Sequence, residues 1–95
     1  MKRSEVKLHY VADAKAKTLK RAKWESFEFL MHSEDEILVR NKSYGTESEK
    51  HTHVVHFEDN EPKHCTCKAN KHIEGPCKHR VAAAVNDVVM GVMVG

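Results

Sequence analysis

Long apolar runs, aromatic side chains and cysteines are all scarce in this sequence of 95 residues. No stretch provides the about 20 consecutive apolar residues that a membrane-spanning helix needs, so we expect no contact with a membrane. A chain of this length buries only about 60–65% of the surface that its unfolded form exposes. Domains with so small a core are often stapled by a disulfide or a structural metal.

The chain has three cysteines, an odd number, so a disulfide framework would leave one of them unpaired. A thiolate metal site in a reducing compartment accounts for them better, and the first residues lack the apolar stretch of a signal peptide. We therefore expect a cytoplasmic protein. Buried free cysteines, or one disulfide with a spare thiol, remain open as alternatives.

All three cysteines belong to one short pattern, C-x-C-x9-C-x-H, formed by Cys65, Cys67, Cys77 and His79. Residues two apart point to the same face of an extended strand, whereas on a helix they lie about 200° apart. The first pair is therefore predicted at a strand end or in a turn. Pro76 is suited to a helix start, which places the second pair in the first helical turn.

Four such ligands are typical of a tetrahedral structural zinc of the Cys3His class. Because four protein ligands leave no coordination position for water, the pattern predicts one structural zinc and no enzyme activity. A nucleophilic pair of Cys77 and His79, or a redox role for Cys65 and Cys67, explains less of the pattern.

The other histidines compete for the fourth ligand position. His64 and His72 lie close enough in sequence to replace His79. A second group, formed by His51, His53 and His56, contains no cysteine, so we expect solvent-facing strand residues there rather than a metal site.

Positive charge is concentrated at the start of the chain. Residues 1–24 carry eight Lys/Arg and two acids (+6), residues 25–95 carry eight and twelve (−4), and the sum is the net +2. Such asymmetry favours a polyanionic partner, and we expect nucleic acid. A solvated helix face or a flexible tail is an equally good reading. The candidate contacts are Lys15, Lys17, Lys20, Arg21, Lys23, Lys68, Lys78 and Arg80.

Periodicity predicts an α+β fold: a small antiparallel sheet of three or four strands followed by a C-terminal helix, stapled by zinc. The expected strands cover residues 27–31, 37–40, 53–57 and 63–67, and a loop is expected at 41–50. One helix with a valine stripe is expected from Val81 to Val92. We divide the chain into a basic arm at 1–23, marginally helical or disordered, and a zinc-binding domain at 24–95.

The motif Cys65-x-Cys67-x9-Cys77-x-His79, followed at once by a helix of small residues, resembles the SWIM zinc finger. Residues 24–90 are similar to short stand-alone SWIM proteins of archaea. The resemblance implies zinc binding by these four residues and a role in DNA binding or protein–protein contact.

An adaptor that contacts a protein, or a weak homodimer, is therefore the alternative to a nucleic-acid-binding monomer. The candidate contact residues for this role are Val88, Val89, Val92 and Val94, or Phe27 and Phe29.

Overall fold

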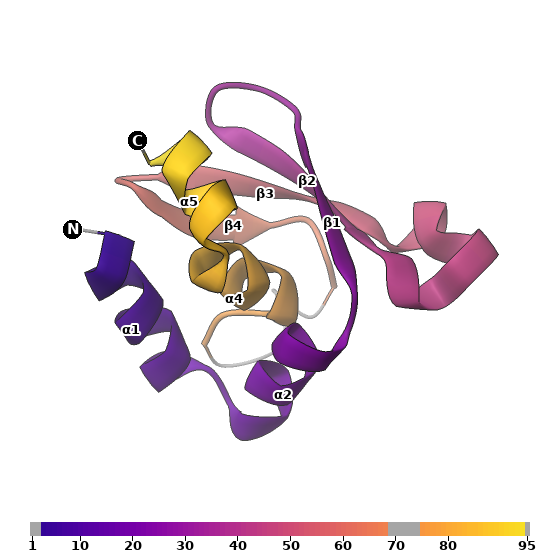
Figure 1. Ribbon diagram of the computed structural model, residues 1–95, viewed down its shortest axis with the longest axis horizontal. Coiled ribbons are helices and arrows are strands. Elements are labelled where there is room, and N and C mark those ends of the chain that lie inside the picture. The colour runs from indigo at the N-terminus through magenta and orange to yellow at the C-terminus, as the bar shows by residue number, and fades with distance from the viewer. Residues whose placement is uncertain (1–2, 69–74, 95) are drawn as a thin grey trace.

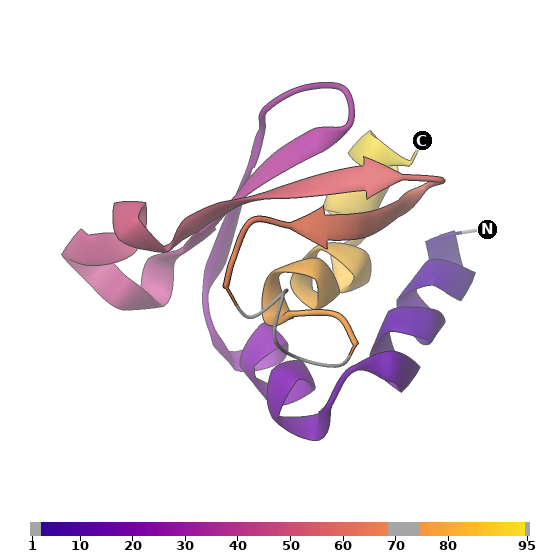
Figure 2. The same ribbon diagram turned by 180° about the vertical axis from the view of Figure 1, so that it is seen from behind.

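The computed structural model describes residues 3–68 and 75–94, and it consists of one antiparallel sheet with helices packed on one face (Figures 1 and 2). The four strands follow one another across the sheet in the order β1-β2-β3-β4. This arrangement confirms the predicted α+β fold. The elements are α1 (Arg3–Asp13), α2 (Ala16–Trp24), β1 (Phe27–Met31), β2 (Glu36–Asn41), η1 (Lys42–His51), β3 (Thr52–Glu58), β4 (Glu61–Cys65), α4 (Lys78–Val85) and α5 (Asp87–Met93).

The strands form where the sequence alternates between apolar and polar residues, because one face of the sheet is covered and the other is open. On β2, Ile37 and Val39 are buried while the residues between them are not. On β3, Val55 and Phe57 continue the covered face. Val55 is paired with Cys65 of β4, so the strand register brings the first zinc-ligand pair to the side where the helices lie.

The connection between β2 and β3, expected to be a loop, is a 3-10 helix, η1. The Asn41 side chain caps it by accepting a hydrogen bond from the Ser43 backbone N–H at 3.0 Å. Gly45 interrupts the helix with a positive φ of 58°, a conformation that glycine adopts without steric cost. Figure 1 shows η1 projecting from the end of the sheet, away from α1.

Residues 3–24 differ from the expected arm, because they form two ordered helices that pack against α4. Among residues 5–24, whose burial the structure describes, three side chains are buried: Val6 and Tyr10 from α1 and Ala22 from α2. Only Ala22 belongs to the alanine-rich residues 11–23, whereas Val6 and Tyr10, the larger of the three side chains, precede them. The boundary between residues 23 and 24 stays a prediction.

Tyr10 anchors α1 to the rest of the fold. Its hydroxyl group donates a hydrogen bond to the backbone carbonyl of Pro62 at 2.9 Å and accepts one from Arg80 Nη2 at 3.4 Å. A second close approach lies about one turn further along, at the C-terminal end of α1, where a Cβ added to Gly75 would come within 2.7 Å of the Asp13 carbonyl oxygen. Tyr10 and Gly75 together hold α1 against both β4 and the segment that leads into α4.

The predicted C-terminal helix is wrong in one respect, because it is broken at Asn86 into α4 and α5. Asn86 has extended backbone angles (φ −90°, ψ 111°), and its side chain accepts hydrogen bonds from the N–H groups of Val88 and Val89. Asparagine is among the residues that best cap a helix N-terminus, and this competes with continuing the first helix. As a result Val88 and Val92 point to solvent instead of extending one buried stripe.

Within residues 3–68 and 75–94, the helices are all too short or too polar to cross a bilayer.

Candidate metal centre

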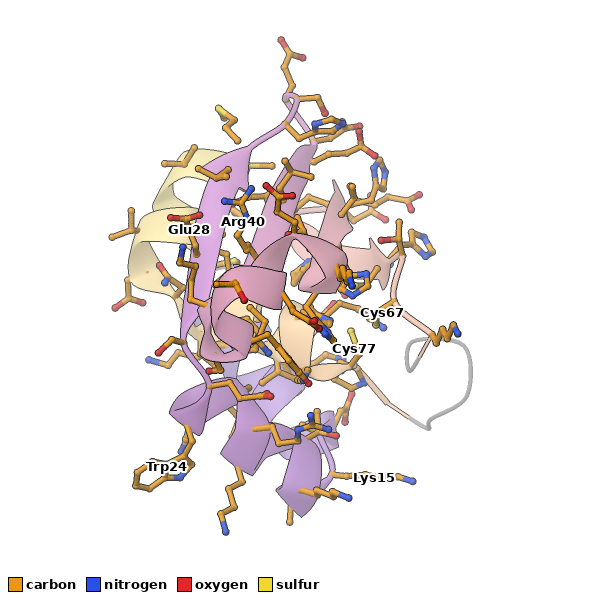
Figure 3. The ribbon with its side chains drawn as sticks, turned by 90° about the vertical axis from the view of Figure 1, so that its right-hand side faces the viewer. Lys15, Trp24, Glu28, Arg40, Cys67 and Cys77 are labelled. Carbon is orange, nitrogen blue, oxygen red and sulfur yellow. The ribbon has the colours of Figure 1, made fainter. Side chains whose placement is uncertain are left out.

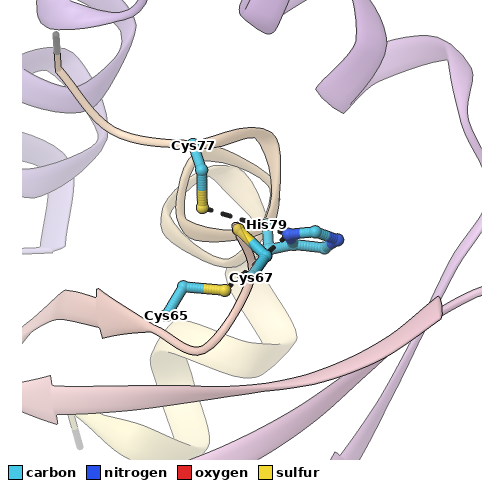
Figure 4. A group of neighbouring side chains, drawn as sticks. All are labelled: Cys65, Cys67, Cys77 and His79. Atoms are coloured by element: carbon cyan, nitrogen blue, oxygen red, sulfur yellow. Dashed lines mark hydrogen bonds between the residues drawn. The ribbon is translucent and has the colours of Figure 1, made fainter. Parts of the chain in front are cut away.

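The four predicted zinc ligands converge at the point where β4 ends and α4 begins (Figure 4). Cys65 is the last residue of β4, and Cys67 follows in the turn. Cys77 occupies the N-cap position of α4, and His79 lies in the first turn of that helix. This placement confirms the local structure predicted from the two-residue spacings.

The distances between the ligand atoms fit a tetrahedral zinc ion. All four lie within 4.8 Å of one another. His79 Nδ1 is 3.7 Å from Cys65 Sγ and 3.9 Å from Cys77 Sγ. Zn–S bonds of about 2.3 Å and a Zn–N bond of about 2.0–2.1 Å at tetrahedral angles would separate sulfur and nitrogen by about 3.6 Å. The group therefore needs only small movements to hold the ion, with Nδ1 as the histidine ligand.

Burial and sulfur crowding make this site suited to a cation. All four ligand residues are buried. Hydrogen bonding with Cys67 and Cys77, together with burial, raises the pKa of the Cys65 thiol above its ordinary value. A thiophilic cation that binds here must therefore displace protons, and its charge then compensates the thiolates. The protein binds one structural zinc through Cys65, Cys67, Cys77 and His79.

The His79 ring is enclosed by two further rings from the covered face of the sheet. Phe27 of β1 meets it edge-on, with ring centroids 5.8 Å apart, and His53 of β3 lies with its centroid at 4.8 Å. Burial and the neighbouring His79 lower the pKa of His53, which favours its neutral form. These contacts restrict the orientation of the ligand ring, as neighbouring groups do at other metal sites.

His53 is a residue that the sequence analysis missed, since we expected it to face solvent. The signal was present in the two-residue period, because His53 has the same parity as the buried Val55 and Phe57. His56 has the opposite parity and pairs with His64 on the open face. His64 is exposed and lies 3.4 Å from Glu58, outside the ligand group, while the other alternative ligand, His72, lies outside the described residues.

Comparison with known families identifies the segment that carries this site. Residues 49–86 match the SWIM zinc finger family. These residues form a SWIM zinc finger. Neither the curated proteins nor the solved structures with which the chain was compared gave a match. The SWIM finger thus comprises β3, β4 and α4, and the remaining elements surround it.

Basic residues from α2 lie directly beside the SWIM finger. A cavity of about 260 Å³ separates the start of α2 from the zinc ligands. Three of its lining residues, Lys15, Lys17 and Arg21, belong to α2 or its N-cap, and Lys78 comes from α4. Cys67 and His79 line the same cavity, so it ends at the zinc site. The structure thereby brings together four of the eight candidate nucleic-acid contacts.

The other four candidates are arranged differently. Lys20 and Lys23 are exposed on α2, and Lys68 is exposed just after Cys67. Arg80 is half-buried: its Nε donates a hydrogen bond to the Pro62 carbonyl at 2.7 Å, and its guanidinium lies over the Tyr10 ring. These contacts give Arg80 a structural role, and its contact with nucleic acid stays a prediction.

Proposed function

We propose that this SWIM finger binds nucleic acid, with DNA as the partner, through the basic residues of α2 and the cavity beside the zinc site. The cavity is the observation that carries the proposal, because Lys15, Lys17, Arg21 and Lys78 line it from two separate elements. Phosphate groups supply about half or more of the hydrogen-bonded contacts in protein–DNA complexes, and lysine and arginine are their usual partners.

Ion pairs within the protein indicate which basic side chains are available to bind phosphate. Glu25 pairs with Lys78 at 2.9 Å and with Arg21 at 3.3 Å. Within the described part of the chain, no ion pair joins the other basic residues of α2. A zinc with three thiolates and a neutral histidine carries a net charge of −1, which opposes a phosphate deep in the cavity. Phosphates should therefore bind at the rim, near Lys15 and Lys17, rather than against the ligands.

A role without catalysis is part of the proposal. Four protein ligands complete the zinc coordination, whereas a catalytic zinc keeps a position for water or substrate. The thiolate ligands also support a reducing, cytoplasmic location, because such compartments keep cysteines in the form that binds metal.

Fluorescence anisotropy with labelled single-stranded and double-stranded DNA and RNA, over a range of salt concentrations, tests this proposal. Each phosphate contact should contribute a log–log salt slope of about −0.9 on duplex DNA or about −0.7 on a single strand. The variant Lys17→Gln/Lys20→Gln should bind more weakly and lose about two such contributions. The control Lys42→Gln/Lys50→Gln removes the same charge from η1 and should leave the slope unchanged. Absence of binding at low salt would refute the proposal.

A second candidate, a protein adaptor or weak homodimer, is favoured by α5. Val88 is 77% exposed and Val92 is 58% exposed on this helix. Of the other residues considered for this role, Val89 is buried, and Phe27, Phe29 and Val94 pack against the core. Light scattering of the protein and of Val88→Ser/Val92→Ser over a range of concentrations tests self-association, and a monomer at every concentration would exclude a homodimer.

A further inference from the structure

The only tryptophan of the chain, Trp24, ends α2 and is 79% exposed. Single exposed apolar residues are common. Tryptophan, however, has a large apolar surface, so leaving it in water forgoes more burial free energy than for most other side chains. Figure 3 shows Trp24 projecting from the same end of the molecule as Lys15, away from the sheet. The packing of α2 therefore leaves the largest apolar side chain of the protein unused.

Helix geometry places Trp24 within the basic face of α2. Lys17, Lys20 and Arg21 precede it by seven, four and three residues, the spacings that bring side chains to one face of a helix. With a rise of 1.5 Å per residue, Lys20 and Lys17 lie about 6 Å and about 10 Å from Trp24 along the helix axis. The opposite face, with Ala22 and Leu19, packs against α4.

An aromatic side chain flanked by cations matches what single-stranded nucleic acid offers. Unpaired bases expose a flat face that stacks on an aromatic ring, while the strand's phosphates bind neighbouring cations. In a duplex the base faces are already stacked on one another. A membrane surface fits less well, because interfacial helices insert a broad apolar face, and Leu19 and Ala22 are turned toward the protein.

We propose that Trp24 is a stacking platform for an unpaired base, and that Lys17, Lys20 and Arg21 hold the adjacent phosphates. This inference rests on the proposed nucleic-acid function and specifies its ligand as single-stranded. Arg21 also pairs with Glu25 at 3.3 Å. It can bind a phosphate at the same time, because the pair is partly exposed and the guanidinium has several donors. Stacking tolerates any base, so the binding should show little sequence preference.

Intrinsic fluorescence provides a direct test, since the only emitting tryptophan is the proposed contact. Titration of the zinc-loaded protein with a thymidine oligonucleotide of about 12 residues should quench Trp24, and a blunt duplex of equal length should quench it much less. Trp24→Ala should weaken binding of the single strand about 5- to 150-fold, the equivalent of about 1–3 kcal/mol per stacked base. Trp24→Phe should retain most of the affinity. Because stacking involves no phosphate, the salt slope of Trp24→Ala should equal that of the wild type.

The control Leu8→Ala removes another exposed apolar side chain, on α1, and should leave the affinity unchanged. Zinc content and circular dichroism should show that every variant is folded. If a labelled single strand binds but Trp24 is not quenched and Trp24→Ala binds equally well, the stacking inference is refuted while the proposed function stands. Equal affinity for the duplex, or quenching only by anionic vesicles, also refutes the inference. If no nucleic acid binds, the proposed function is refuted with it.

Discussion

The ammonium nitrogen of Lys78 lies 2.9 and 3.0 Å from the two carboxylate oxygens of Glu25, a residue 53 positions earlier in the chain. Both side chains are mostly buried, with 15% and 18% of their surface exposed. Lys78 stands between the ligands Cys77 and His79, whereas Glu25 is the C-cap residue of α2. The pair thus fixes the basic helix to the zinc site.

Replacing Glu25 by glutamine should destabilise the protein at neutral pH. Burial by itself would raise the pKa of Glu25, but the hydrogen bonds and charge of Lys78 outweigh it and hold this pKa below its ordinary value of 4.5. A lowered carboxyl pKa stabilises the folded state above the ordinary value, and this stabilisation is lost as the pH falls through the folded-state value. Urea unfolding of Glu25→Gln should show a loss of about 1–2 kcal/mol near pH 7. The difference from wild type should shrink as the pH falls below 4.5.

Zinc release in acid affects both proteins, so the test uses their difference at each pH. Glu34→Gln, at an exposed position in the β1–β2 turn, is the matched control and should have little effect. A loss for Glu25→Gln that is the same at every pH would show that the charge of Glu25 does not contribute.

Replacing Cys77 by serine should unfold the SWIM finger. Binding free energy at a structural zinc site is folding free energy, because the ligands are not assembled in the unfolded chain. Loss of stoichiometric zinc and of the sharp thermal transition is expected for Cys77→Ser, and a chelator should have the same effect on the wild type. Thr66→Ser keeps the hydroxyl that accepts the Val54 N–H and should retain its metal. Full zinc content in Cys77→Ser would contradict the ligand assignment.

Replacing Arg80 by alanine should lower the stability of the protein without changing its phosphate contacts with nucleic acid. The change removes a donor to the buried Pro62 carbonyl and the cation over Tyr10. The Pro62 carbonyl keeps the Tyr10 hydroxyl as a donor, so the change removes one hydrogen bond from a charged group. Such a bond contributes about 1.5–3 kcal/mol, which chemical denaturation would measure. The salt slope of nucleic-acid binding should not change. Lys17→Ala, at an exposed position, should behave in the opposite way, with unchanged stability and a lower slope. A lower slope for Arg80→Ala would place it among the phosphate contacts.

Replacing Asn86 by alanine should weaken the break between α4 and α5. The Asn86 side chain accepts hydrogen bonds from two N–H groups at 3.0 Å. Loss of such a cap costs about 0.5–2 kcal/mol. Asn86→Asp preserves the acceptor and should be nearly as stable as the wild type, which thermal unfolding of both variants can establish. Equal destabilisation by the two substitutions would show that the cap is not what matters at this position.

The zinc site and the strands were predictable because they depend on residues close together in sequence. The spacing of Cys65 and Cys67 required an extended segment, and Pro76 indicated the helix start. The packing of α1 was not predictable in this way. It depends on Tyr10, whose partners Pro62 and Arg80 lie 52 and 70 residues away.

The break at Asn86 escaped prediction for another reason. Apolar periodicity continues through it from Val85 to Val89, and only the capping preference of asparagine signals the interruption. The structural role of Arg80 was missed for a similar reason. It depends on where α1 docks, and the sequence showed only a positive charge, which we interpreted as a phosphate contact.

The hydrogen bond between Tyr10 and Arg80 has a consequence for the order of assembly. Bringing together Cys65 and His79 closes a loop of 14 residues, whereas joining Tyr10 to Arg80 closes one of 70. On chain entropy alone, the longer closure costs about 1.4 kcal/mol more. The metal ligands should therefore meet early. Pro62 and Arg80, which bind the Tyr10 hydroxyl, are brought together only afterwards. We expect α1 to be the last helix to dock.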